Sequence, residues 1–245
     1  MPARKQPPRR KKTQATRVAP VNLGGATTYP IDRRPNRVVI SDMASPLPGS
    51  GSARFMDSLP SQLKAKDLRR LVELIIGARK KGLPFHWMMG AHVIKVGLSP
   101  LVIDLMKREL ITGVSFNGAG VIHDLELAFW GGTSEDVASG LADGSFGMAR
   151  ETGSAFSAAL NFASENQYGL GEGVGHYIRR KKAPHARLSI LAECARLELP
   201  ATIHVSIGSD IVAQHASFSG SQAGELSHQD FRLLAAVMME ADRGG

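Results

Sequence analysis

Cysteine and long apolar stretches are the scarcest features of this 245-residue sequence. Cys194 is its only cysteine, so no disulfide can form within the chain, and we expect a reducing, cytoplasmic environment. No stretch reaches the ~18 to 20 consecutive apolar residues that a membrane-spanning helix needs. The basic N-terminus also lacks the apolar core of a secretion signal. The sequence therefore predicts a protein without a membrane partner.

An excess of positive charge is absent from most of the chain, although the net charge is +8. Ten of the 30 Lys and Arg residues, but one of the 22 acids, fall in residues 1–37, which leaves 20 bases and 21 acids in the body. Because nucleic acid is bound by basic charge clustered on a fold, we expect no specific nucleic-acid partner. Low hydrophobicity and scattered prolines predict that residues 1–52 form a disordered tail and linker, with one folded domain in residues 53–245.

Three short apolar segments predict a parallel sheet. They are residues 85–89 (FHWMM), 111–116 (ITGVSF) and 201–207 (ATIHVSI). A helix that begins at Ser99 and Pro100 separates the first two, which gives the strand, helix and strand of a βαβ unit. We therefore predict an α/β fold in which helices flank a parallel sheet.

Helical patterns fill most of the remaining sequence. Apolar residues in segments 61–80 and 228–241 recur with the spacing of amphipathic helices, and further segments between them behave alike. Three strands for about seven helices make a thin sheet for an α/β domain. We therefore expect the fold to lack C-terminal strands that would follow Gly245.

Each predicted strand ends in a turn of small residues followed by His or Asp. The turns are MGAH (89–92), NGAG (117–120) and IGSD (207–210). Ligands of open parallel sheets bind beyond the carboxyl ends of the strands. NGAG alone does not complete a G-x-G-x-x-G motif, and it is equally compatible with a tight strand-to-helix turn. Three such turns at one sheet edge favour a shared ligand-binding crevice.

Several histidines and aspartates near these turns suggest metal ligation as an alternative. Their spacing matches no H-E-x-x-H or similar pattern, and histidines near strand ends are more often hydrogen-bonding partners. We therefore expect no metal, and a metal-dependent hydrolase is kept as a third hypothesis that bound zinc or manganese would reveal. The residues concerned are His92, His123, Asp124, His204, Asp210 and His215.

Three segments carry a family resemblance: GAHVIKVGLSPLVIDLMKRELITGVSFNGAGVIHDLE, TSEDVASGLADGSFGMARETG and LPATIHVSIGSDIV. They resemble the deoxyhypusine synthase family, in its bacterial deoxyhypusine synthase-like branch, over about residues 55–245. The resemblance implies a Rossmann-like, NAD-binding fold that assembles as a homotetramer with active sites at dimer interfaces.

The resemblance also implies a transferase reaction. NAD takes a hydride from spermidine, 1,3-diaminopropane leaves, and the aminobutyl group passes through an enzyme lysine to an acceptor amine. The acceptor is a lysine of the hypusine-bearing translation factor, or a small amine such as putrescine. A polyamine substrate and a possible protein lysine acceptor are therefore the expected partners.

Cofactor-contacting residues follow from the same resemblance. Asn117, Gly118, Ala119 and Gly120 fall on the family's glycine-containing NAD segment. His92 falls where the family has an NAD-contacting asparagine. These five residues are the predicted NAD contacts.

Substrate-binding residues are assigned by the same motifs to His123, Asp124 and Asp210. Asp210 is the counterpart of an acid in the family's TDGSLGD loop, in an alignment that needs a gap. Ile122 and His123 stand where the family has two glutamates, so carboxylates that would attract a polycation are missing there.

No lysine matches the family's nucleophile, which lies in a C-terminal segment. Lys95, Lys181 and Lys182 lie elsewhere in the sequence, so the catalytic residue is unassigned. The alternative hypothesis is accordingly a non-catalytic NAD-binding or scaffold homologue that has lost the transferase chemistry.

Overall fold

The computed structural model describes residues 22–42 and 63–242, and its centre is a parallel sheet of three strands. The strands are β2 (His86–Met89), β3 (Gly113–Asn117) and β5 (Ala201–His204), in the order β2-β3-β5. Each overlaps a predicted segment, so the predicted α/β fold with a parallel sheet is confirmed. A separate antiparallel pair joins β1 (Val38–Val39) to β4 (Gly132–Thr133).

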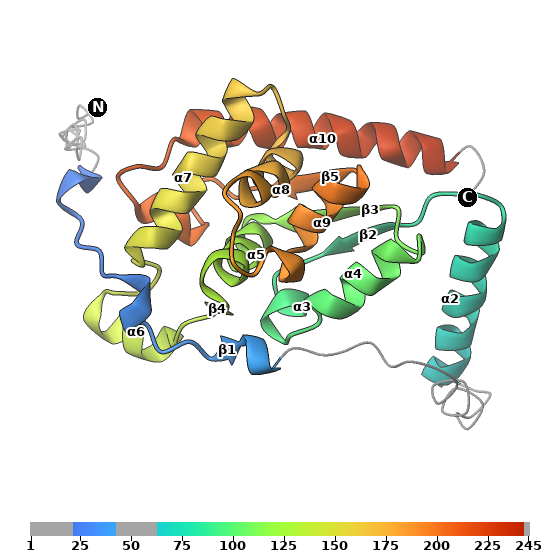
Figure 1. The fold of residues 1–245 in the computed structure, drawn as a ribbon, viewed down its shortest axis with the longest axis horizontal. Helices are drawn as coiled ribbons and strands as arrows, with labels where there is room; N and C mark the ends of the chain where they lie inside the picture. The colour runs from blue at the N-terminus through green and yellow to red at the C-terminus, as the bar shows by residue number, and fades with distance from the viewer. Residues whose placement is uncertain (1–21, 43–62, 243–245) are drawn as a thin grey trace, which may run out of the picture.

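Helices pack on the core face of the sheet and along its β5 edge. α10 (Gly220–Asp242) runs along the β5 edge, α4 (Ser99–Lys107) packs on the core face, and α2 (Leu63–Lys80) stands apart from the sheet (Figure 1). None of the helices in these described stretches is long and apolar enough to cross a membrane. The other helical elements are α3 (His92–Lys95), α5 (Gly118–Trp130), α6 (Val137–Asp143), α7 (Arg150–Glu165), α8 (Leu170–Arg180), α9 (Ile190–Leu197) and the 3-10 turns η1 (Leu23–Gly25), η2 (Ile31–Arg33), η3 (Ile40–Asp42), η4 (Ala186–Leu188) and η5 (Ile211–Gln214).

The apolar core lies on one face of the sheet. Successive strand side chains point to opposite faces, so Val114 and Phe116 of β3 and Ile203 of β5 share the core face and are at most 2% exposed. They belong to one cluster with Val121 and Leu125 of α5. Burying each such side chain contributes about 1.5 to 3 kcal/mol. This packing fixes the start of α5 against the end of β3.

A row of polar side chains crosses the opposite face. The Ser115 hydroxyl lies 2.7 Å from His86 Nε2 and 2.6 Å from the Thr202 hydroxyl, which lies 3.0 Å from His204 Nε2. Burial lowers the pKa of both imidazoles, and the charge of His204 lowers that of His86 further. His204 therefore serves as a hydrogen-bonding partner within the sheet.

Residues 22–42 pack on the domain, although the sequence predicts them to be part of a tail and linker. The backbone of Tyr29 forms a bridge to the start of α7, and Arg34 is 6% exposed because it pairs with a buried glutamate. Residues 1–21 and 43–52 of the predicted tail lie outside the described residues. Composition did not reveal the packed part because its partners are far away along the chain.

Asp230 of α10 joins α8 to β5. Its Oδ2 accepts hydrogen bonds from Gly171 N at 2.9 Å and from Ile203 N at 2.6 Å, whereas Oδ1 is buried without a partner. Burial raises the pKa of Asp230 to about 7, although both N–H groups oppose the rise. The ionised carboxylate is therefore disfavoured in the folded state.

We expect Asp230→Asn to change the pH dependence of stability. A raised folded pKa means that Asp230 contributes most below the unfolded value near 4, and that this contribution is lost as pH rises to about 7. Relative to wild type, Asp230→Asn should gain about 2 to 4 kcal/mol between pH 4 and pH 7. Urea unfolding at several pH values measures this difference. The exposed Asp32→Asn is the control, and a pH-independent difference for Asp230→Asn would contradict the assignment.

Candidate functional site at the carboxyl edge of the sheet

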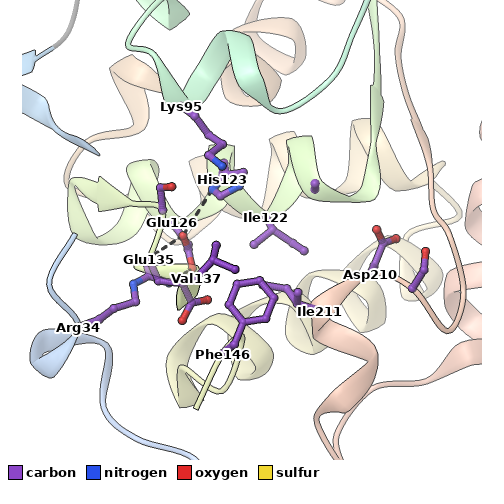
Figure 2. A pocket seen from close by; sticks show the side chains of 13 residues that line it. Arg34, Lys95, Ile122, His123, Glu126, Glu135, Val137, Phe146, Asp210 and Ile211 are labelled. Carbon is purple, nitrogen blue, oxygen red and sulfur yellow. Dashed lines mark hydrogen bonds and ion pairs between the residues drawn. The ribbon is translucent and has the colours of Figure 1, made fainter. Parts of the chain in front are cut away.

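A cavity of about 180 Å³ lies at the carboxyl edge of the sheet (Figure 2). Residues that follow each strand line it, namely Lys95 after β2, His123 after β3 and Asp210 after β5. Arg34 of the N-terminal segment also lines it. The segments that follow the three strands thus meet at one cavity, as their parallel order predicts. The other lining residues are Ala119, Ile122, Glu126, Ser134, Glu135, Val137, Phe146, Ser209 and Ile211.

The NGAG turn forms the start of α5 beside this cavity. Asn117 is the N-cap, and its Oδ1 accepts a hydrogen bond from Gly120 N at 2.9 Å. Gly118 packs against Asp210 so closely that a Cβ there would lie 2.0 Å from Asp210 Oδ2. Asp210 Oδ2 also accepts a hydrogen bond from Ser206 N at 2.8 Å. Four of the predicted contact residues, Asn117, Gly118, Gly120 and Asp210, therefore meet at one place.

The position of Asp210 affects what the turn can bind. Burial raises the pKa of Asp210, although the Ser206 N–H opposes the rise. A carboxylate beside the N-terminus of α5 would repel a phosphate placed there. A carboxylate at such a turn suits hydrogen-bond donors instead, such as a ribose diol or an ammonium group.

A buried ion pair closes the cavity on the side of the N-terminal segment. Arg34 donates two hydrogen bonds to the Glu126 carboxylate, Nη1 to Oε1 and Nη2 to Oε2, both at 2.9 Å. The Thr152 hydroxyl donates to Oε1 at 2.7 Å and the Thr133 hydroxyl donates to Oε2 at 2.5 Å. Burial favours a raised pKa for Glu126, but these four hydrogen bonds and the charge of Arg34 outweigh it and hold the pKa below its usual value.

His123 lies between this network and the cavity. Its Nδ1 lies 2.5 Å from the Thr133 hydroxyl oxygen. Burial lowers the pKa of His123 to about 4, and the charges of Lys95 and Arg34 act in the same direction against that of Glu126. The imidazole is therefore uncharged at neutral pH.

Four charged cavity residues were missed by sequence reasoning, namely Arg34, Lys95, Glu126 and Glu135. Arg34 lies in the predicted tail, Lys95 was set aside for its place in the sequence, and Glu126 and Glu135 lie in the quoted segments without an assigned role. Glu135 accepts hydrogen bonds from Gly147 N and from the Tyr29 hydroxyl. Burial and then the charge of Glu135 raise the pKa of Tyr29 to about 12. No local motif identifies these residues, because distant segments bring them together.

Two predicted site residues lie neither in the cavity lining nor in the NGAG turn beside it. Asp124 is fully buried, and its carboxylate accepts hydrogen bonds from Ser189 Oγ at 2.6 Å and from Ile190 N at 2.8 Å at the start of α9. This placement makes Asp124 a helix cap in the core rather than a substrate contact. His92 is exposed at the start of α3, away from the cavity lining.

Metal ligation finds no support in residues 22–42 and 63–242. No group of three or more His, Cys, Asp or Glu side chains in these stretches could hold a metal ion. His204 belongs to the polar row on the sheet, and His215 Nε2 bonds to the Gly147 carbonyl at 2.8 Å. Both imidazoles thus have hydrogen-bonding roles.

Comparisons with known proteins do not assign the chain to a family. No protein-family model matches the chain, and no curated protein matches it.

Proposed function

We propose that the protein holds a polyamine in this cavity and is an NAD-dependent transferase with a deoxyhypusine synthase-like fold. It would transfer an aminobutyl group from spermidine to an amine or a protein lysine. As proposed, it acts in the cytoplasm as a homo-oligomer. The observation that carries the proposal is that one small cavity contains two carboxylates, Asp210 and Glu135, with apolar side chains between them.

The two carboxylates lie on opposite sides of apolar side chains. Asp210 lies to one side of Ile122 and Phe146, and Glu135 lies to the other (Figure 2). A polyamine has the complementary chemistry, since its ammonium groups are separated by methylene chains. The cavity is smaller than the roughly 300 to 1,000 Å³ of drug-sized pockets, which suits one slender ligand.

The charge balance of the lining also favours a cation. Arg34 neutralises Glu126, and His123 is uncharged at neutral pH. Asp210 and Glu135 then stand against Lys95, which leaves one net negative charge. These carboxylates take the place of the family's glutamates, which are Ile122 and His123 here.

NAD is larger than this cavity, so it would contact the turn through ribose hydroxyl groups rather than through phosphate. Asp210, beside Gly118, could accept hydrogen bonds from a ribose diol, and Ala119 lines the same cavity. When bound, NAD would supply the hydride acceptor for amine oxidation. The chain's own contribution is to hold the amine between carboxylates and to keep His123 uncharged.

Lys95 supplies an amine at this site. It is half-buried and lines the cavity, and its ammonium group makes no ion pair or hydrogen bond within the described parts of the chain. A reaction that passes its group through an enzyme lysine would find this one within the cavity. Lys95 is therefore our candidate for that role, although it is not the family's C-terminal lysine.

Spermidine and NAD together should yield 1,3-diaminopropane, detected by chromatography after incubation with the wild-type protein. Asp210→Asn removes one carboxylate and should weaken the apparent spermidine affinity by about 10- to 100-fold, since a charged hydrogen bond contributes about 1.5 to 3 kcal/mol. Asp67→Asn on the exposed surface of α2 is the matched control and should leave the affinity unchanged.

A non-catalytic amine-binding protein is the second candidate, favoured by the small volume of the cavity. It predicts that putrescine raises the melting temperature of the wild type, but not of Asp210→Asn, and that no 1,3-diaminopropane forms. If no 1,3-diaminopropane forms and no polyamine stabilises the protein, both candidates are refuted.

A further inference from the structure

Glu126 determines where the proton of the Thr133 hydroxyl lies. An ionised carboxylate can only accept hydrogen bonds. Its four partners are the two Arg34 N–H groups, the Thr152 hydroxyl and the Thr133 hydroxyl. Thr133 has a single hydroxyl hydrogen, and its bond to Glu126 Oε2 at 2.5 Å uses it.

The Thr133 hydroxyl in turn determines the tautomer of His123. With its hydrogen donated to Glu126, Thr133 Oγ1 can only accept from His123 Nδ1, which lies 2.5 Å away. The uncharged imidazole must then carry its hydrogen on Nδ1, which leaves a lone pair on Nε2. Nε2 makes no hydrogen bond within the described residues, and the ring lines the cavity (Figure 2).

We propose that Thr133 is a positioning residue that holds His123 in the Nδ1-protonated form, so that Nε2 accepts a hydrogen bond from an ammonium group of the ligand. The identity of the ligand rests on the proposed function, whereas the tautomer rests on the hydrogen bonds of Thr133 and on the uncharged state of His123. An uncharged acceptor suits a cationic ligand because it adds a hydrogen bond without adding positive charge. This device supplies a ligand contact at the position where the family's glutamate is missing.

Nitrogen NMR of protein labelled with ¹⁵N-histidine tests the tautomer directly. The protonated and unprotonated ring nitrogens of a neutral imidazole resonate far apart, and His123→Gln identifies the signals of His123. Wild type and Thr133→Ser should show a protonated Nδ1 and an unprotonated Nε2. Thr133→Val keeps the shape of the side chain but removes the acceptor, so the proton should move wholly or partly to Nε2.

Spermidine tests the acceptor role in the same samples. Saturating spermidine, judged by thermal shift, should move the Nε2 signal of wild type and Thr133→Ser. It should bind Thr133→Val about tenfold more weakly. Circular dichroism shows whether the valine variant is folded, and the wild-type spectrum decides the tautomer if it is not.

Four outcomes would overturn parts of this inference. A protonated Nε2 in the wild type, or an unchanged spectrum in folded Thr133→Val, removes the role of Thr133. An unmoved Nε2 signal at saturation removes the acceptor role. An absence of spermidine binding removes the proposed function and the acceptor role with it, while the spectra still decide the tautomer.

Discussion

Arg34→Met is expected to lower the free energy of unfolding by about 3 to 5 kcal/mol, because it leaves the Glu126 carboxylate buried without its counter-ion. Both side chains are at most 3% exposed, and the two hydrogen bonds between them are 2.9 Å long. Loss of Arg34 also removes one of the contacts that attach the N-terminal segment beside the cavity. Urea unfolding followed by circular dichroism measures the change.

Arg33→Met is the matched control for this prediction. Arg33 is exposed and makes no ion pair within the described parts of the chain, so its loss should change the free energy of unfolding by less than about 0.5 kcal/mol. The double variant Arg34→Met/Glu126→Gln removes both charges and should recover much of the loss, since the amide can still bond to the neighbouring hydroxyls. Equal effects for Arg34→Met and Arg33→Met would contradict the buried ion pair.

Gly171→Ala should destabilise the protein by about 3 kcal/mol or more through overpacking. A Cβ at Gly171 would lie 2.3 Å from the carbonyl oxygen of Ala201 in β5. Backbone cannot move aside as a flexible side chain can, so α8 would have to shift away from the sheet. The Gly171 N–H bond to Asp230 would be disturbed at the same time. The midpoint of urea unfolding reports the loss.

Gly77→Ala provides the same substitution with the opposite expected sign. Gly77 lies within α2, and a Cβ there would meet nothing within 4 Å. Alanine favours a helix by about 1 kcal/mol over glycine, so this variant should be as stable as wild type or slightly more stable. A Gly171→Ala variant as stable as Gly77→Ala would show that α8 does not pack directly on β5.

Local sequence was sufficient to predict the sheet. Apolar runs bounded by turn residues marked the three strands, and the chain between the first two is too long for a hairpin, so a parallel pair was the expected arrangement. The end of β3 was also foreseeable, since Asn117 before Gly118 is a good helix start. These features depend on residues within a few positions of one another.

Much of the cavity lining was not foreseeable from the sequence. Arg34 and Glu126 are 92 residues apart, and nothing near either residue indicates the other. Asp124 was assigned to the ligand, with His123, by the motif that resembles the family, but on α5 the two side chains point in different directions, one to α9 and one to the cavity. Lys95 reaches the cavity because α3 packs beside α5.

The sequence by itself therefore determined the strands, their parallel order and the small-residue turns at their carboxyl ends, because periodicity and turn chemistry act locally. The tertiary structure alone decided which charges meet there. Packing of residues 22–42 on the domain brought Arg34 to Glu126, and the return of β5 beside β3 brought Asp210 to Gly118. Burial then set the protonation of His123, because the pKa of a side chain depends on its surroundings in space rather than on its neighbours in sequence.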